Sequence, residues 1–207
     1  NLFSLPKSKN SLFQKIDIDS VVDRLEKDGV YQQLQLPQNL VEEILHYAYS
    51  HDCYADRNRD RGFKYYCHKQ AEEKYQKSIM RGEYIDTFTD CPAISQIAQD
   101  PQDIAIAGKY LNPKPVLMET RLWWNFPVDE TNCDLSKGAR TFHYDLDDYR
   151  CVVFFFYLTD VDLQSGPHVC VKGSHKQKKL EYLLSWNLNR SDREIIDYYG
   201  QESILTI

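Results

Sequence analysis

The sequence of 207 residues lacks any long apolar run and any excess of positive charge. Its longest apolar stretch, Cys151 to Leu158, has eight residues, whereas a membrane-spanning helix needs about 20. Lysine and arginine together number 25 against 31 aspartates and glutamates, which gives a net charge of −6. These features argue against a membrane span in this sequence, and against broad electrostatic binding to nucleic acid or anionic membranes.

Close cysteine pairs and internal repeats are also lacking. The six cysteines form no Cys-x-x-Cys pair and no tight disulfide framework, which favours a reducing, cytoplasmic setting. No low-complexity tract appears either. Aromatic residues, in contrast, are frequent, with 15 Tyr, 9 Phe and 3 Trp. They favour a β-containing core or an aromatic-lined pocket.

The length fits one domain, residues 1–207, that is large enough to bury a core. Its first part, residues 1–112, is expected to be mainly helical. Apolar periodicity, caps and proline breaks predict helices at 20–28, around 40–48, at 68–80, 92–98 and 101–110. The first of these is expected to be capped by Asp19 or Ser20 and to end at Gly29. A strand at 30–36 and a polar loop at 52–69 complete this part.

The second part, residues 113–207, has the character of a β structure. Strands are predicted at 116–126, 152–158, 169–171 and 203–207, separated by turn signals that contain glycine and proline. We therefore expect an α+β fold in which helices pack on a sandwich or jelly-roll core. Because the sequence ends inside a predicted strand, we expect this core to be incomplete.

One short pattern carries a clear chemical hypothesis. In the stretch Thr141 to Asp148, His143 and Asp145 are two residues apart, and in an extended strand such residues point to the same face. One imidazole and one carboxylate are two of the three ligands of the 2-His-1-carboxylate site of non-haem Fe(II) oxygenases. The tripeptide by itself also fits a polar strand end with solvated carboxylates.

The neighbourhood of this pattern resembles the phytanoyl-CoA dioxygenase family. The resemblance covers roughly residues 20–207, and its specific part is residues 109–176. The matching features occur in the family's order: Lys109–Leu111, Arg121–Trp124, the His143-x-Asp145 pair, Tyr157–Asp160, Gly166-Pro167 and Gly173–Lys176.

The resemblance implies a double-stranded β-helix that holds Fe(II), with 2-oxoglutarate and O₂ as co-substrates. His143 and Asp145 map onto the first two metal ligands. The implied activity is hydroxylation of an aliphatic C–H bond in a small-molecule substrate, which the resemblance does not identify. Halogenation is disfavoured, because that chemistry usually vacates the carboxylate position that Asp145 fills.

The family also needs a distal histidine, followed by an arginine or lysine that pairs with 2-oxoglutarate. His175 follows His143 by only 32 residues, whereas about five intervening strands need roughly 40 to 60. We therefore expect the third ligand beyond Ile207, and the chain as given to be metal-poor or inactive. The alternatives are a non-catalytic β-helix binding module that has lost the triad, and a cupin-like metal protein that does not use 2-oxoglutarate.

Further residues are candidates for the same pocket. Arg121, Thr141 and Tyr157 are predicted to face the co-substrate, and His168 and Trp123 to line the substrate pocket. Strand alternation puts Arg121 and Trp123 on one face. The competing interpretation makes the tryptophans core residues and Arg121 a surface ion pair.

Two other clusters are weighed and set aside. A zinc site could be drawn from four residues, but their spacing matches no common zinc finger; they are His51, Cys53, Cys67 and His68. A basic segment could hold a phosphate, but interspersed aspartates favour a self-neutralised loop; its cations are Arg57, Arg59, Arg61, Lys64 and Lys69.

Overall fold

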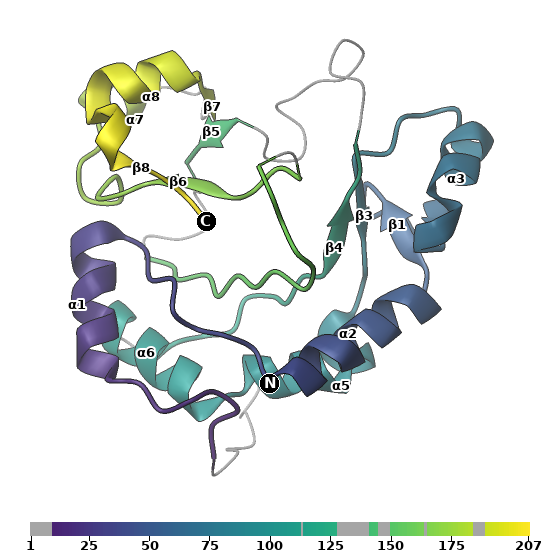
Figure 1. Cartoon of the computed structure of the whole chain (residues 1–207), viewed down its shortest axis with the longest axis horizontal. Helices are drawn as coiled ribbons and strands as arrows, with labels where there is room; N and C mark the ends of the chain where they lie inside the picture. The colour runs from purple at the N-terminus through teal and green to yellow at the C-terminus, as the bar shows by residue number, and fades with distance from the viewer. Residues whose placement is uncertain (1–9, 113, 128–140, 145–149, 164, 184–188) are drawn as a thin grey trace. The chain divides into compact units, whose positions relative to one another are not determined.

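The structure, a computed structural model of the whole chain, describes residues 10–112, 114–127, 141–144, 150–163, 165–183 and 189–207 (Figure 1). Its contacts divide the chain into two compact units. The first unit consists of residues 1–14, 36–104 and 115–134. The second unit consists of residues 15–35, 105–114 and 135–207.

The first unit combines helices with a four-stranded antiparallel sheet of order β2-β1-β3-β4. Its elements are α2 (Gln38–Ser50), β1 (Cys53–Ala55), η1 (Arg59–Arg61), β2 (Gly62–Phe63), η2 (Tyr65–Cys67), α3 (His68–Tyr75), β3 (Arg81–Glu83), α4 (Thr87–Asp90), α5 (Pro92–Ala98) and β4 (Trp123–Asn125). The register pairs Cys53 with Phe63, Tyr54 with Glu83, and Gly82 with Trp124.

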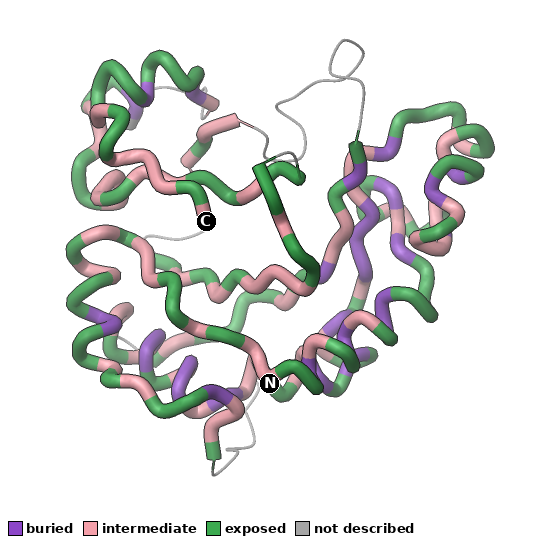
Figure 2. The backbone as a smooth tube through the Cα atoms, in the orientation of Figure 1, coloured by how far each residue is buried: buried purple, intermediate pink, exposed green. Residues whose placement is uncertain are grey.

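The core of the first unit lies between α2 and this sheet. Buried residues gather on α2, β1 and β3 (Figure 2), and α2 contributes Leu40, Ile44 and Ala48. The strands β1 and β3 approach closely at Gly82, where an added Cβ would lie 2.7 Å from Sγ of Cys53. Burial raises the pKa of the Cys53 thiol to about 12, so this thiol packs as an apolar group.

The second unit contains two-stranded antiparallel pairs and short helices. Its elements are α1 (Ile18–Asp28), β5 (Phe142–His143), β6 (Val169–Val171), α7 (Leu180–Leu183), β7 (Asn189–Arg190), α8 (Asp192–Tyr199), η4 (Gln201–Ser203) and β8 (Ile204–Thr206). Strand β5 pairs with β7, and β6 pairs with β8. The helix α6 (Pro101–Leu111) passes from the first unit into the second after Ile104.

The ends of α1 are fixed by local chemistry. Asp17 caps the helix by accepting a hydrogen bond from the N–H of Asp19 at 3.1 Å. Gly29 ends it in the left-handed conformation, at φ 76°. The turn at residues 173–176 covers the last carbonyls, because the N–H of Gly173 donates to Asp28 O at 2.8 Å and Nε2 of His175 donates to Glu26 O at 3.2 Å.

Several predicted elements are confirmed. The helix predicted at 20–28 is α1, which begins two residues earlier and is capped by Asp17 instead of Asp19 or Ser20. The helix around 40–48 is α2, and those at 92–98 and 101–110 are α5 and α6. The strands at 169–171 and 203–207 are β6 and β8. The helix predicted at 68–80 ends early, at Tyr75, where Gln76 turns the chain at φ 50°.

Other predicted elements are wrong. The stretches 30–36 and 152–158 belong to no strand, and of the stretch 116–126 only Trp123–Asn125 forms a strand. Residues 52–69, predicted as a loop, contain β1 and β2. Alternating or continuous apolar residues favour an extended chain, but a strand also needs a neighbouring edge with which to pair. Exposure of Val153 (72%) and Phe155 (42%) accordingly differs from the burial expected of a core strand.

The mixture of helices and small antiparallel sheets confirms the α+β class. The second part of the chain is not all β, since it holds α7 and α8. Helix α8 begins at a capping box, in which Ser191 and Glu194 bond to each other's backbone N–H. No helix among the described residues is long and apolar enough to cross a bilayer.

Two buried carboxylates stand at the start of α6. Asp100 is fully buried, and Oγ of Ser11 and the N–H of Leu12 donate to it at 2.9 and 2.6 Å. The N–H of Gln102 donates to the same carboxylate at 2.8 Å. Asp103 is also buried, and its Oδ1 accepts no hydrogen bond. Burial, with a smaller contribution from the charge of Asp100, raises the pKa of Asp103 to about 8.

We expect Asp103→Asn to stabilise the protein in a pH-dependent way. A carboxyl whose pKa is raised on folding stabilises the fold below about pH 4, and this contribution is lost as the pH rises towards 8. The pKa rises by about four units, each of which corresponds to about 1.4 kcal/mol, so the variant should gain up to about 5 kcal/mol of unfolding free energy at pH 8 and little at pH 4. Chemical denaturation at pH 4, 6 and 8 measures this.

Asp60→Asn, at an exposed aspartate of the first unit, is the control and should show no such trend. A gain for Asp103→Asn that is equal at all three pH values would mean that Asp103 is not protonated in the folded protein.

Candidate functional site

The predicted metal ligand His143 lies in β5, at the ladder with β7. The register pairs His143 with Asn189 and Phe142 with Arg190, and α7 and α8 belong to the same part of the chain (Figure 1). The side chain of His143 is exposed, as access for a metal and a co-substrate requires. Asp145, the second predicted ligand, lies outside the described residues.

The ring of His143 is held by a backbone carbonyl. Its Nδ1 lies 2.8 Å from the carbonyl oxygen of Thr141. Since a carbonyl only accepts hydrogen bonds, Nδ1 is the donor, and in the neutral ring the lone pair is then on Nε2. Metal-binding histidines are oriented in this way, by donating the second ring nitrogen's proton to a carbonyl or carboxylate. The ring of His143 is therefore held in the way that is common for metal-binding histidines.

Thr141 is tied in turn to β7. Its hydroxyl donates to Oδ1 of Asn189 at 2.9 Å. Thr141 is a predicted co-substrate residue, and the structure gives its hydroxyl this bond within the protein. Asn189 is a site residue that sequence reasoning missed. Its position opposite His143 depends on strand register, which no local sequence pattern reveals.

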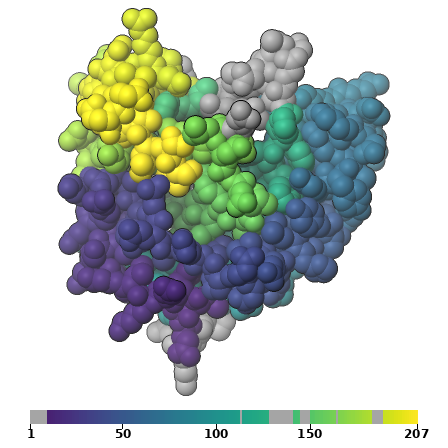
Figure 3. Space-filling view, viewed as in Figure 1, coloured from purple at the N-terminus to yellow at the C-terminus, as the bar shows by residue number. Residues whose placement is uncertain are grey.

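Aromatic side chains surround this pair of strands. The guanidinium of Arg190, a residue only 6% exposed, lies 4.3 Å from the ring centre of Tyr182. The hydroxyls of Tyr144 and Tyr199 lie 2.9 Å apart. Burial, and then the hydrogen bond with Tyr144, raise the pKa of Tyr199. These contacts fasten the end of β5 to α8, whose residues form a continuous part of the surface with the C-terminal segment (Figure 3).

Tyr157 and His168 are brought together near the pair β6–β8. The hydroxyl of Tyr157 donates to Ile207 O at 3.0 Å and accepts the N–H of His168 at 2.5 Å. The N–H of Ile207 donates to His168 O at 2.8 Å. The imidazole of His168 lies against Phe155, with ring centres 5.5 Å apart. The Tyr157 hydroxyl thus bonds to both segments, at Ile207 and at His168, at one end of this strand pair.

Arg121 and Trp123 belong to the first unit. They share a face as predicted, with the guanidinium 5.8 Å from the Trp123 ring centre, while Leu122 between them is buried. Arg121 also pairs with the buried carboxylate of Glu83 at 2.6 Å. This ion pair is what the competing interpretation of Arg121 expects. Trp124 of the opposite face donates to the Tyr84 hydroxyl at 3.0 Å and is part of the packing.

Residues of the two other clusters, the His/Cys group and the basic segment, have local partners. Nδ1 of His51 contacts Tyr47 O at 2.9 Å, and Nε2 of His68 contacts Ile79 O at 3.0 Å. Each cation of the basic segment meets a carboxylate, which confirms a self-neutralised loop: Arg57 with Glu119, Arg59 with Asp86, Arg61 with Asp56, Lys64 with Asp52, and Lys69 with Glu72.

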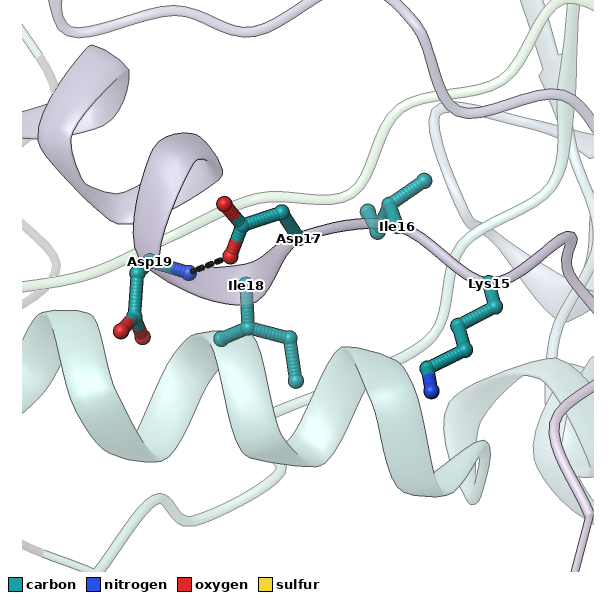
Figure 4. Close-up of a pocket in the computed structure, with 5 residues that line it drawn as sticks. All are labelled: Lys15, Ile16, Asp17, Ile18 and Asp19. Atoms are coloured by element: carbon teal, nitrogen blue, oxygen red, sulfur yellow. Dashed lines mark hydrogen bonds between the residues drawn. The ribbon is translucent and has the colours of Figure 1, made fainter.

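A depression at the start of α1 is lined by residues 15–19 (Figure 4). Its carboxylates are already engaged, since Asp17 caps α1 and Asp19 pairs with Lys109. Within the described part of the chain, no three His, Cys, Asp or Glu side chains are grouped so that they could hold a metal ion. The candidate site therefore remains the one around His143, to which Asp145 would contribute.

We expect Tyr157→Phe to lower the unfolding free energy by about 1–2 kcal/mol, because two backbone groups lose the hydroxyl with which they bond. Thermal denaturation measures the loss, and hydrogen exchange of the His168 amide, which donates to this hydroxyl, should accelerate. Tyr66→Phe, at a tyrosine 69% exposed, should change neither. Unchanged stability of Tyr157→Phe would refute the structural role and leave the hydroxyl for the predicted co-substrate contact.

Comparison of the chain with protein-family models, with curated proteins and with solved structures gives no match. The functional assignment therefore depends on the residues around β5 and β7 and on the motifs of this sequence.

Proposed function

We propose that this chain carries the iron site of an Fe(II)- and 2-oxoglutarate-dependent dioxygenase of the phytanoyl-CoA dioxygenase type. The substrate is a small molecule whose aliphatic C–H bond is hydroxylated. One observation carries the proposal: the Thr141 carbonyl holds the Nδ1 proton of His143 and so places the ring's lone pair on Nε2. This is the form of histidine that binds a metal.

His143 and Asp145 would hold the metal. Their spacing suits a strand, where residues two apart share a face, and His143 lies in a strand. An imidazole and a carboxylate suit Fe(II), and such sites keep positions open for a co-substrate and O₂. When bound, the iron with 2-oxoglutarate and O₂ supplies the oxidising power that converts the C–H bond to an alcohol.

The rest of the chain would orient and enclose the reactants. The antiparallel pairs β5–β7 and β6–β8 are compatible with a β-helix, which is part of this proposal. Roles for Thr141 and Tyr157 towards the co-substrate, and for His168 towards the substrate, also belong to it. Arg121 and Trp123 lie in the first unit and are not part of the site proposed around His143. So does a cytoplasmic location, which the scattered cysteines favour.

Anaerobic titration with Fe(II) and then 2-oxoglutarate tests the proposal. The protein used should include whatever residues its gene encodes after Ile207. We expect a weak visible charge-transfer band on addition of 2-oxoglutarate, and its loss, by at least tenfold in intensity at equal concentrations, in both His143→Ala and Asp145→Ala. His46→Ala, which removes an exposed histidine of α2, is the matched control and should retain the band.

The other outcomes select the alternatives. Absence of metal binding in the unaltered protein would contradict the proposal and support a binding module. Metal binding that is lost in both variants but gives no band with 2-oxoglutarate would support a cupin-like protein with another co-substrate.

A further inference from the structure

We infer that Asn189 is a positioning residue for the metal ligand His143, and that it acts through Thr141. The inference rests on the proposed function for the identity of the ligand. It adds a residue that lies 46 positions further along the sequence than the ligand and has no place in the His-x-Asp pattern.

The geometry consists of two consecutive hydrogen bonds. Oδ1 of Asn189 accepts the hydroxyl proton of Thr141 at 2.9 Å. The carbonyl of Thr141 then accepts the Nδ1 proton of His143 at 2.8 Å. Thr141 therefore connects β7 with the imidazole by its side chain and its backbone.

The backbone ladder by itself gives Thr141 little support. Strand β5 consists of Phe142 and His143 only, and Thr141 lies just before it. A threonine has few χ1 rotamers, so fixing its hydroxyl also restrains its backbone. The bond to Asn189 thus extends the attachment to β7 by one residue, to the residue whose carbonyl orients His143.

The two residues of β7, Asn189 and Arg190, have different roles. Arg190 is buried against Tyr182 and serves the packing of this region. Asn189 is opposite His143 in the register, and its side chain accepts a hydrogen bond from Thr141.

The consequence is a preference between the two neutral forms of His143. With Thr141 held, Nδ1 keeps its proton, and in the neutral ring Nε2 carries the lone pair through which a metal would bind. Without the bond, the carbonyl turns more freely, and the proton can move to Nε2, where it blocks coordination. Removing a residue that hydrogen-bonds to a metal ligand, without binding the metal itself, typically lowers metal affinity by about 10–100-fold.

Two measurements test the inference: ¹⁵N NMR of the His143 ring in the metal-free protein, and anaerobic Fe(II) binding. The unaltered protein should show a protonated Nδ1. Asn189→Ala and Thr141→Val should both shift the proton towards Nε2 and weaken Fe(II) binding about tenfold. Asn189→Asp, which keeps an acceptor oxygen, should restore the protonated Nδ1. Asn125→Ala, which removes an asparagine side chain of β4 that accepts from Arg81, should change neither quantity.

The failures are distinguishable. An unchanged tautomer and unchanged Fe(II) affinity in folded Asn189→Ala and Thr141→Val would overturn the relay and leave the proposed function intact. The same would follow if Asn189→Asp behaved like Asn189→Ala, since the role would then be packing. If the unaltered protein binds no Fe(II), the proposed function fails, and the tautomer of His143 by itself decides whether Asn189 orients the ring.

Discussion

A backbone carbonyl accepts hydrogen bonds but donates none, so the carbonyl of Thr141 makes Nδ1 of His143 the donor and, in the neutral ring, leaves the lone pair on Nε2. The chemistry proposed for the chain depends on this single contact. A histidine protonated on Nε2 could occupy the same strand and show the same exposure, yet it could not bind a metal through that nitrogen. The surrounding elements therefore matter to function mainly as they hold the Thr141 carbonyl in place.

The two units hold their residues in different ways. In the first unit, α2 and a four-stranded sheet enclose a core, and β1 and β3 approach as closely as Gly82 allows. In the second unit the described strands form pairs of two or three residues, and side-chain hydrogen bonds reinforce their ends. Thr141 does this for β5–β7 and Tyr157 for β6–β8. Because these strand pairs are short, individual side-chain hydrogen bonds contribute much to the positioning of the residues in the candidate site.

Helices with caps and clear apolar periodicity could be predicted from the sequence, as α1 and α5 show. Strands were harder, because whether residues 152–158 pair depends on an edge elsewhere in the chain. In the site, His143 could be found because ligand chemistry restricts residue type and local spacing. Asn189 could not, because its role arises from the register of β7 against β5. For Arg121, strand alternation correctly predicted that it shares a face with Trp123, but its ion-pair partner Glu83 could be identified only from the structure.

The raised pKa of Asp103 links folding to proton exchange with the solvent. At neutral pH this carboxyl is ionised in the unfolded chain and mostly protonated in the folded protein, so folding takes up close to one proton at this position. The proton is supplied by the buffer. The heat measured on unfolding should therefore contain the ionisation enthalpy of the buffer, and calorimetric enthalpies recorded in phosphate and in Tris should differ even though the structure is the same.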